Sequence, residues 1–206
     1  MQPSLFDLGA PTFDPTFRGV RRIDLGLGAW VEYAPRFLVG HAEVFRELRD
    51  GMRWQARRRP MYDRIVDVPR LLARLPQDGP VPPVLDQISH VLCRRYQRPL
   101  TRLAAAFYRD GADSVAPHGD RLTNREQAVV AVLSLGEPRR FLLRPASSDA
   151  TVGGHDFSLG WGDLLVMGGT CQDTWRHGVP KAAFAGPRIS VQFREAGTDL
   201  ADATTR

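Results

Sequence analysis

Apolar residues at helical spacing predict two helices in the first half of the chain. In residues 41–52 (HAEVFRELRDGM) the apolar side chains fall on one face, and a glycine is placed to end the helix. Two prolines then open a second helix over VLDQISHVLCRRYQ, because proline is tolerated in a first helical turn. The two apolar stripes consist of Val44, Phe45 and Leu48, and of Val84, Leu85, Ile88, Val91, Leu92 and Tyr96.

After Pro99 the pattern becomes typical of β-strands, separated by clusters of Gly, Pro, Asp and Ser. Helices first and strands afterwards indicate an α+β fold, with helices that buttress a β-sandwich or barrel. A double-stranded β-helix (jelly-roll) is one such core, although the number of strands does not fix that topology. We predict strands at about 102–109, 127–135, 139–144, 155–159, 162–167 and 187–195.

The length of 206 residues suits one domain with a sizeable core. Its first 35 residues are rich in Pro and Gly, which predicts an extended arm with short strands. The segment 53–75 is polar and loaded with arginine, with aromatic residues interleaved.

The last predicted strand has an apolar face, made by Ile189, Val191 and Phe193, and a polar face with Arg188 and Arg194. If the apolar face packs against the helices, both arginines point into the barrel, where unpaired charges are costly. A small dicarboxylate would satisfy them with two-pronged hydrogen bonds. An edge strand with its arginines in water is the alternative.

Charge and cysteine content change this picture only a little. The net charge is +5, from 28 Lys+Arg against 23 Asp+Glu, and Lys181 is the single lysine. Such an arginine excess suits contacts to phosphate or carboxylate, and a GC-rich genome would explain it equally well. The charge permits nucleic-acid binding without demonstrating it.

The two cysteines, Cys93 and Cys171, stand far apart, so we expect reduced thiols and neither a disulfide framework nor a zinc finger. No apolar run approaches the roughly 20 residues of a membrane-spanning helix, and the N-terminus has no secretory pattern. We therefore expect a cytoplasmic protein, with no membrane partner and a monomer as the default state.

A histidine and an aspartate stand one residue apart in SVAPHGDRLT. In an extended segment, His118 and Asp120 would point to the same side and could share a metal ion. His177, where the chain leaves an apolar strand, is the best third ligand. Two histidines and one carboxylate suit non-haem Fe(II), because they leave positions for a co-substrate and O₂. Taken alone, such a triple also arises by chance.

Four segments in order give this sequence a more specific character. They are FYRDGADSVAPHGD, SLGEPRRFLLRP, GDLLVMGGTCQDTWRHGVPK and PRISVQFR, with WQARRRPMYDRIVDVPRL as a looser extension upstream. Their order and spacing resemble those of the AlkB family, Fe(II)- and 2-oxoglutarate-dependent dioxygenases that remove alkyl groups from nucleic-acid bases. The resemblance implies a jelly-roll catalytic core over 100–196 and a nucleotide-recognition lid over 53–75.

The resemblance also implies roles for single residues. His118, Asp120 and His177 would hold the iron, and Arg188 and Tyr108 would bind the far carboxylate of 2-oxoglutarate. Arg194 would contact the end of 2-oxoglutarate that chelates the metal. Two departures from the family pattern are Ala106, where relatives often have an asparagine that contacts 2-oxoglutarate, and Pro117, where they tend to have another side chain.

On the substrate side, the resemblance implies direct-reversal repair of a base that has left the stack, with hydroxylation of the alkyl carbon and release of an aldehyde. Stacking and phosphate contacts are expected from the arginine-rich segment, and one further contact from the strand after SLGEP. The candidates are Trp54, Met61, Tyr62, Arg58, Arg64 and Arg139, alongside Arg53, Arg57 and Arg59. Trp54 or Tyr62 could instead anchor the lid to the core.

The nucleic-acid partner is expected to be DNA, with RNA as an alternative, and 1-methyladenine and 3-methylcytosine are the lesions that the family implies. A nucleic-acid-binding protein without catalysis is a second hypothesis, which Ala106 leaves open. A third is an oxygenase that acts on protein or a small molecule.

Overall fold

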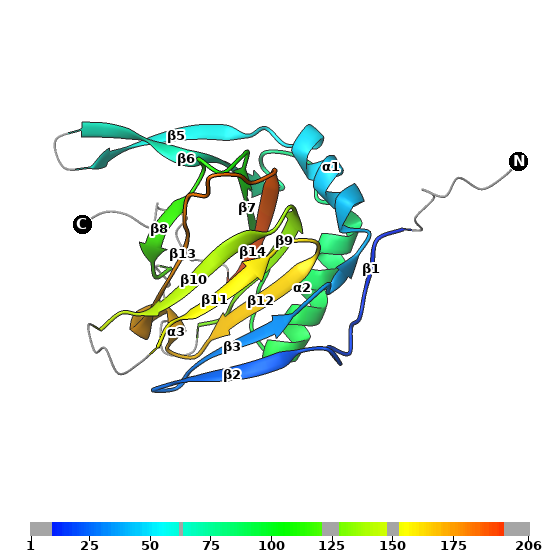
Figure 1. Ribbon diagram of the computed structural model, residues 1–206. Helices are drawn as coiled ribbons and strands as arrows, with labels where there is room; N and C mark the ends of the chain where they lie inside the picture. Colours follow the sequence, from blue (N-terminus) through cyan, green and yellow to red (C-terminus); the bar gives the residue numbers. More distant parts are fainter. Residues whose placement is uncertain (1–9, 62–63, 121–127, 148–152, 196–206) are drawn as a thin grey trace, which may run out of the picture.

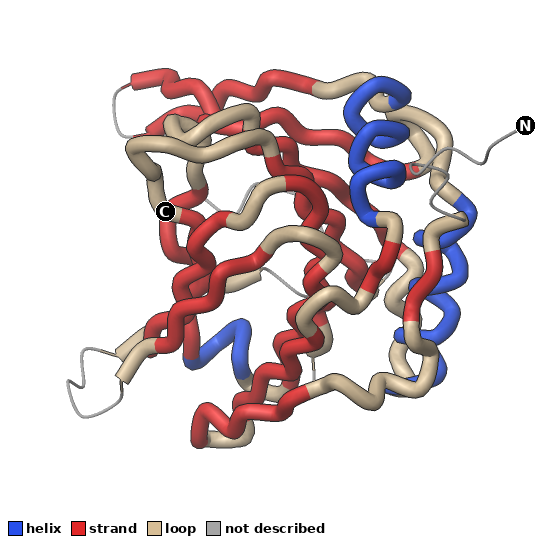
Figure 2. The backbone as a smooth tube through the Cα atoms, turned by 45° about the vertical axis from the view of Figure 1, so that its right-hand side comes forward, coloured by secondary structure: helices blue, strands red, loops and turns tan. Residues whose placement is uncertain are grey.

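Two antiparallel sheets face each other in the computed structural model, and two helices cover the outer side of the larger one (Figures 1 and 2). The structure describes residues 10–61, 64–120, 128–147 and 153–195, with the backbone alone over 59–61 and 64–67. No helix in these ranges is long and apolar enough to cross a membrane.

The larger sheet has eight strands in the order β2-β3-β12-β9-β14-β7-β6-β5. Its central strands are buried on both faces, so their sequences are nearly continuous apolar runs, as in VAVLSLG of β9. In spatial order the strands are β2 (Arg21–Gly26), β3 (Ala29–Ala34), β12 (Asp163–Gly168), β9 (Val130–Gly136), β14 (Arg188–Arg194), β7 (Arg102–Tyr108), β6 (Arg64–Leu75) and β5 (Gln55–Met61).

The smaller sheet has four strands in the order β11-β10-β13-β8, and it covers the inner face of the larger sheet. They are β11 (His155–Leu159), β10 (Arg139–Pro145), β13 (Trp175–Val179) and β8 (Val115–His118). A short helix, α3 (Cys171–Thr174), lies between β12 and β13. Two further short strands, β1 (Thr12–Phe13) and β4 (Leu38–Val39), pair with each other.

The helices α1 (His41–Gly51) and α2 (Pro83–Tyr96) pack on the outer face of the larger sheet. Both predicted apolar stripes face that core, and Ile189, Val191 and Phe193 of β14 are fully buried against them. The period of two then directs Arg188 and Arg194 to the opposite face, between the sheets. A second apolar core fills the space between the two sheets.

The structure confirms the predicted helices and the six strands after Pro99, within a few residues at their ends. The N-terminal segment has the expected short strands, and two of them, β2 and β3, join the larger sheet, where β3 is largely buried between β2 and β12. The strands β5 and β6 pair antiparallel as the β5–β6 hairpin, one end of which extends beyond the rest of the sheet (Figure 1). The strands β8 and β13 were not predicted, since neither shows alternation.

Candidate metal and co-substrate site

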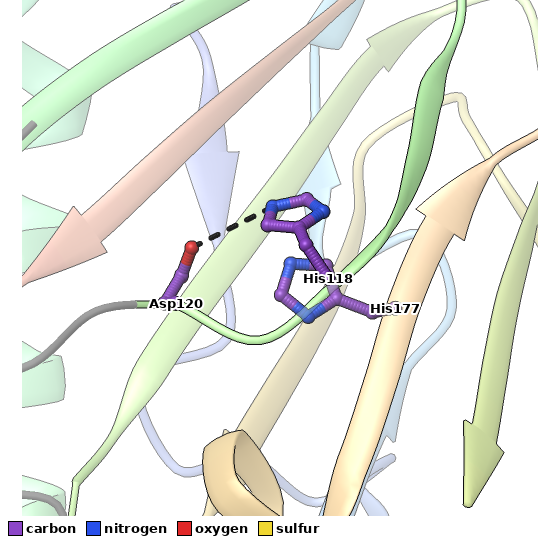
Figure 3. Close-up of side chains that lie close together, drawn as sticks. All are labelled: His118, Asp120 and His177. Carbon is purple, nitrogen blue, oxygen red and sulfur yellow. Dashed lines mark ion pairs between the residues drawn. The ribbon is translucent and has the colours of Figure 1, made fainter. Parts of the chain in front are cut away.

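His118, Asp120 and His177 converge between the two sheets (Figure 3). His118 ends β8 and lies opposite His177 of β13 in the strand register, and Asp120 follows two residues later. One ligand atom from each residue lies within 4.8 Å of the others, and the two imidazole centroids are 4.3 Å apart. This arrangement could hold a metal ion, and its two nitrogens and one oxygen suit Fe(II).

Contacts behind the three side chains fix their orientation. The His118 Nδ1 atom lies 2.9 Å from the Ala116 carbonyl oxygen, which leaves Nε2 to face Asp120 at 3.8 Å. The His177 ring stacks on Phe141, with centroids 5.6 Å apart. A ligand histidine whose other nitrogen is engaged keeps one tautomer and one ring orientation.

Glycine is the only residue type that fits at position 119, between His118 and Asp120. A Cβ atom at this position would lie 2.2 Å from the carbonyl oxygen of Gln172 in α3. The Gln172 side chain is buried, and its Oε1 accepts the Asp120 backbone N–H at 2.8 Å. The α3 segment, which leads directly into the strand of His177, thus also positions the loop of the other two ligands.

The electrostatics of the site keep all three groups ready to bind a cation. Burial, together with the neighbouring His118, lowers the pKa of His177 to about 3. Burial likewise holds the pKa of His118 below its ordinary value. Burial raises the pKa of Asp120, but the interactions with Arg194 and the two histidines outweigh it and lower the net pKa. At neutral pH both imidazoles are neutral and the carboxylate is ionised, which are the forms that bind metal.

Arg188 is buried beside the site and is incompletely paired. Its side chain is 1% exposed, its Nε donates to the Leu159 carbonyl at 3.2 Å, and its Nη2 donates to Ser134 Oγ at 2.7 Å. The guanidinium carbon lies 5.2 Å from the Tyr108 ring centroid. Its Nη1 has no hydrogen-bond partner among the described residues. A buried charge with a free donor fits the far carboxylate of 2-oxoglutarate.

Arg194 lies at the other end of the polar face of β14. Its Nε and Nη2 bind the two oxygens of Asp120 at 3.1 and 3.0 Å. Between the arginines, buried Ser190 lies opposite Ala106, and its Oγ accepts the Gln192 side-chain amide at 2.7 Å. The row of polar groups on β14 therefore runs from Arg188 to the metal-ligand candidate Asp120.

These residues line one cavity of about 130 Å³. Arg188, Tyr108 and Ser190 lie along it with the triad, and Phe141, Val179 and Val115 give it apolar walls. On the side of the β5–β6 hairpin, Arg57, Arg70 and Arg74 line the same cavity. The cavity therefore joins the triad to a cationic surface.

Two of the predicted substrate contacts lie elsewhere. Trp54 is on the helix side of the larger sheet, where its ring packs 5.3 Å from Phe107 and its Nε1 donates to the Arg49 carbonyl at 3.0 Å. This placement favours the alternative in which Trp54 anchors the hairpin. Arg139 is 3% exposed and its guanidinium donates to the carbonyls of Asp110, Asp113 and Pro180.

The remaining substrate candidates lie between residues 58 and 64 of the sequence. Arg58 is exposed on β5. Tyr62 and the side chains of Met61 and Arg64 lie outside the described residues. The sequence analysis missed Gln172 and Ser134, for which the chain carries no local signal. It also missed Arg70 and Arg74, which alternate with Leu72 on one face of β6 and could have been found from that period.

Comparison with known proteins agrees with this geometry. Residues 43–194 match the model of the 2OG-Fe(II) oxygenase superfamily, which defines the class. The alpha-ketoglutarate-dependent dioxygenase alkB homolog 3 of Mus musculus is 32% identical over 120 residues, covering 54% of this chain and 42% of the relative. The Bos taurus homolog is 29% identical over 171 residues, covering 73% of this chain and 60% of the relative. The chain therefore belongs to the 2OG-Fe(II) oxygenase superfamily, whose members use Fe(II), 2-oxoglutarate and O₂, and its similarity to these alkB homologs supports the AlkB family within it.

The solved structures support the fold alone, because their sequence identities are low. OsALKBH1 matches with a TM-score of 0.59 at 16% identity, covering 85% of this chain and 99% of that chain. A 2OG-Fe(II) oxygenase family oxidoreductase from Burkholderia pseudomallei matches with a TM-score of 0.55 at 14% identity, covering 80% of this chain and 84% of that chain. The chain spans about half the length of the curated relatives named above.

Proposed function

We propose that this dioxygenase oxidatively removes alkyl groups from nucleic-acid bases, with DNA as the first substrate to test. The observation that carries the proposal is the cationic wall of Arg57, Arg70 and Arg74, which lines the cavity of the triad. No ion pair engages these three side chains among the described residues. Unpaired arginines on an accessible surface bind phosphates.

In this proposal, His118, Asp120 and His177 hold Fe(II), and the polar face of β14 holds 2-oxoglutarate. Arg188 Nη1 binds the far carboxylate with Tyr108 beside it, and Arg194 orients Asp120 and contacts the chelating end. Ala106 leaves room over β7, and Ser190 opposite it offers a hydroxyl to the co-substrate. We also infer that the two facing sheets form a double-stranded β-helix.

The substrate side is assigned to the β5–β6 hairpin. Arg57 and Arg74 at the cavity, with Arg58 and Arg64 of β5 and β6, bind the phosphates that flank the target nucleotide. Met61 and Tyr62 are proposed to pack against the flipped base. The apolar walls of the cavity exclude water from the reacting carbon.

The reaction consumes one O₂ and one 2-oxoglutarate for each alkyl group. Fe(II), which His118, Asp120 and His177 would hold, would supply the activation of O₂, so that one oxygen atom would pass to succinate as CO₂ leaves and the other to the alkyl carbon. The hydroxylated product then breaks its carbon–nitrogen bond, so that the base nitrogen keeps a proton and an aldehyde is released. No protein nucleophile is needed, and the chain binds, orients and shields the reactants.

The test loads the protein with Fe(II) without oxygen, then adds 2-oxoglutarate, air and short DNA strands with one methylated base. Succinate and demethylated base are measured together, with His118→Ala as the control. Coupled formation of both, lost in the variant, is the expected result. Succinate without repair of DNA or of the matching RNA strands would contradict the proposal and point to a protein or small-molecule substrate. Binding of DNA without formation of either product would point to the second hypothesis, a nucleic-acid-binding protein that does not catalyse the reaction.

A further inference from the structure

The charge of the cavity bears on which alkylated bases it accepts. Asp120 is its one carboxylate among the described residues, and Arg194 already binds both oxygens of that group. No described carboxylate is therefore left to neutralise a cationic substrate. The arginines that line the cavity are Arg57, Arg70, Arg74, Arg188 and Arg194.

Arg70 places hydrogen-bond donors next to the triad. It lines the cavity together with His118, and after burial its charge contributes to the lowered pKa of that histidine. One nitrogen, Nη1, donates to the Ser114 carbonyl at 3.3 Å, and the described residues provide no partner for its other N–H groups. A guanidinium has donors and no acceptor, so Arg70 favours a ligand with an acceptor oxygen.

Alkylated bases fall into two charge classes. A methyl group on N1 of adenine or N3 of cytosine creates a cation at neutral pH, with an exocyclic amine beside the methylated nitrogen. A methyl group on N3 of thymine or N1 of guanine replaces a proton and leaves the base neutral. Two carbonyl oxygens flank the methylated nitrogen in 3-methylthymine, and one does so in 1-methylguanine and in 3-methylcytosine. In 1-methyladenine there is none.

We propose that the site selects neutral alkylated bases with a carbonyl next to the alkylated nitrogen, 3-methylthymine foremost, and that Arg70 reads this carbonyl. The inference rests on the proposed dealkylation of nucleic-acid bases and names its substrate class. A cationic base is disfavoured because it would lie beside Arg70, whose charge no described carboxylate of the cavity neutralises, since Asp120 is paired with Arg194. The expected order of repair is 3-methylthymine, 1-methylguanine, 3-methylcytosine and 1-methyladenine.

The experiment compares kcat/KM for demethylation of four single-stranded DNA oligonucleotides that differ only in the methylated base. We expect 3-methylthymine to exceed 1-methyladenine by about tenfold or more, since one charge-assisted hydrogen bond corresponds to at least that factor. Faster repair of the two cationic bases would overturn this inference and leave the proposed function standing. Succinate formation without repair of any of the four would overturn both.

A variant pair tests the role of Arg70 itself. In Arg70→Gln the ratio of kcat/KM for 3-methylthymine over 1-methyladenine is expected to fall about tenfold. In the control Arg46→Gln, an exposed position of α1 on the helix side of the larger sheet, the ratio stays at the wild-type value. Because a ratio of two substrates does not depend on the fraction of folded enzyme, partial misfolding cannot imitate the effect. If Arg70→Gln kept the wild-type ratio of kcat/KM for the two substrates, Arg70 would have no role in substrate selection.

Discussion

Arg194 and Asp120 form a two-pronged ion pair, with nitrogen–oxygen distances of 3.1 and 3.0 Å, between β14 and the loop after β8. Both side chains are largely buried, at 17% and 6% exposure. The pair therefore neutralises the carboxylate of the proposed metal centre when no cation is bound, and it ties the loop after β8 to the strand that carries Arg188 and Arg194.

We expect Arg194→Gln to destabilise the metal-free protein by about 3 kcal/mol, because the buried carboxylate loses its partner. A divalent ion would compensate Asp120 in its place, so metal should stabilise the variant more than the wild type. Urea unfolding with and without Mn(II), in both proteins, measures this difference. An equal metal effect in the two would show that Arg194 and the metal do not share Asp120.

Arg188→Lys is expected to weaken 2-oxoglutarate binding by about 100-fold, since a lysine keeps the charge and loses the fixed Nη1 donor. Tyr108→Phe should weaken it less, because the ring that lies over the guanidinium remains. Calorimetric titration of 2-oxoglutarate into the Mn(II)-loaded protein gives both constants. Wild-type affinity for 2-oxoglutarate in Arg188→Lys would show that the co-substrate does not bind at this end of β14.

Gly119→Ala should lower metal affinity at least tenfold. The new Cβ would lie 2.2 Å from the Gln172 carbonyl oxygen, so α3 or the His118–Asp120 loop must shift. Gly19→Ala is the matched control, because nothing lies within 4 Å of its added Cβ. Competition with a metal-binding dye reports both affinities, and equal values would show that the loop tolerates the shift.

Glu32 predicts a pH-dependent contribution to stability. It is 7% exposed, accepts hydrogen bonds from Arg95 at 2.9 Å and Tyr96 at 2.7 Å, and so ties α2 to β3. Burial raises the pKa of Glu32, but the bonds from Arg95 and Tyr96 outweigh it and the net pKa is lowered from 4.5. A lowered folded-state pKa means that its stabilisation is complete above the unfolded value and is lost as pH falls through the folded value.

The free energy of unfolding of Glu32→Gln should therefore lie about 2–3 kcal/mol below the wild type at pH 7. The gap should stay constant down to about pH 5.5 and narrow below about pH 4.5. Urea unfolding of both proteins between pH 3.5 and 7 follows the gap. A gap that widens on acidification would mean that the carboxylate is held neutral in the folded protein.

The sequence by itself determined the two helices, most of the strands after Pro99 and the two faces of β14. These features are local, since spacing of 3.6 or 2 residues fixes which side chains share a face. Ile189 and Arg188 were thus assigned to opposite faces before any partner was known. The HGD motif and the family resemblance added His177, whose own strand, WRHGV, has no alternation to reveal it.

Tertiary structure alone decided which face meets the cavity and which polar groups are already satisfied. Arg139 and Arg70 look alike in the sequence, yet Arg139 binds three backbone carbonyls and Arg70 keeps donors free beside His118. Trp54 lies across the sheet from the triad because β6 pairs with β7 in one register. Strand pairing and carbonyl positions join residues far apart in the chain, so no local pattern encodes them.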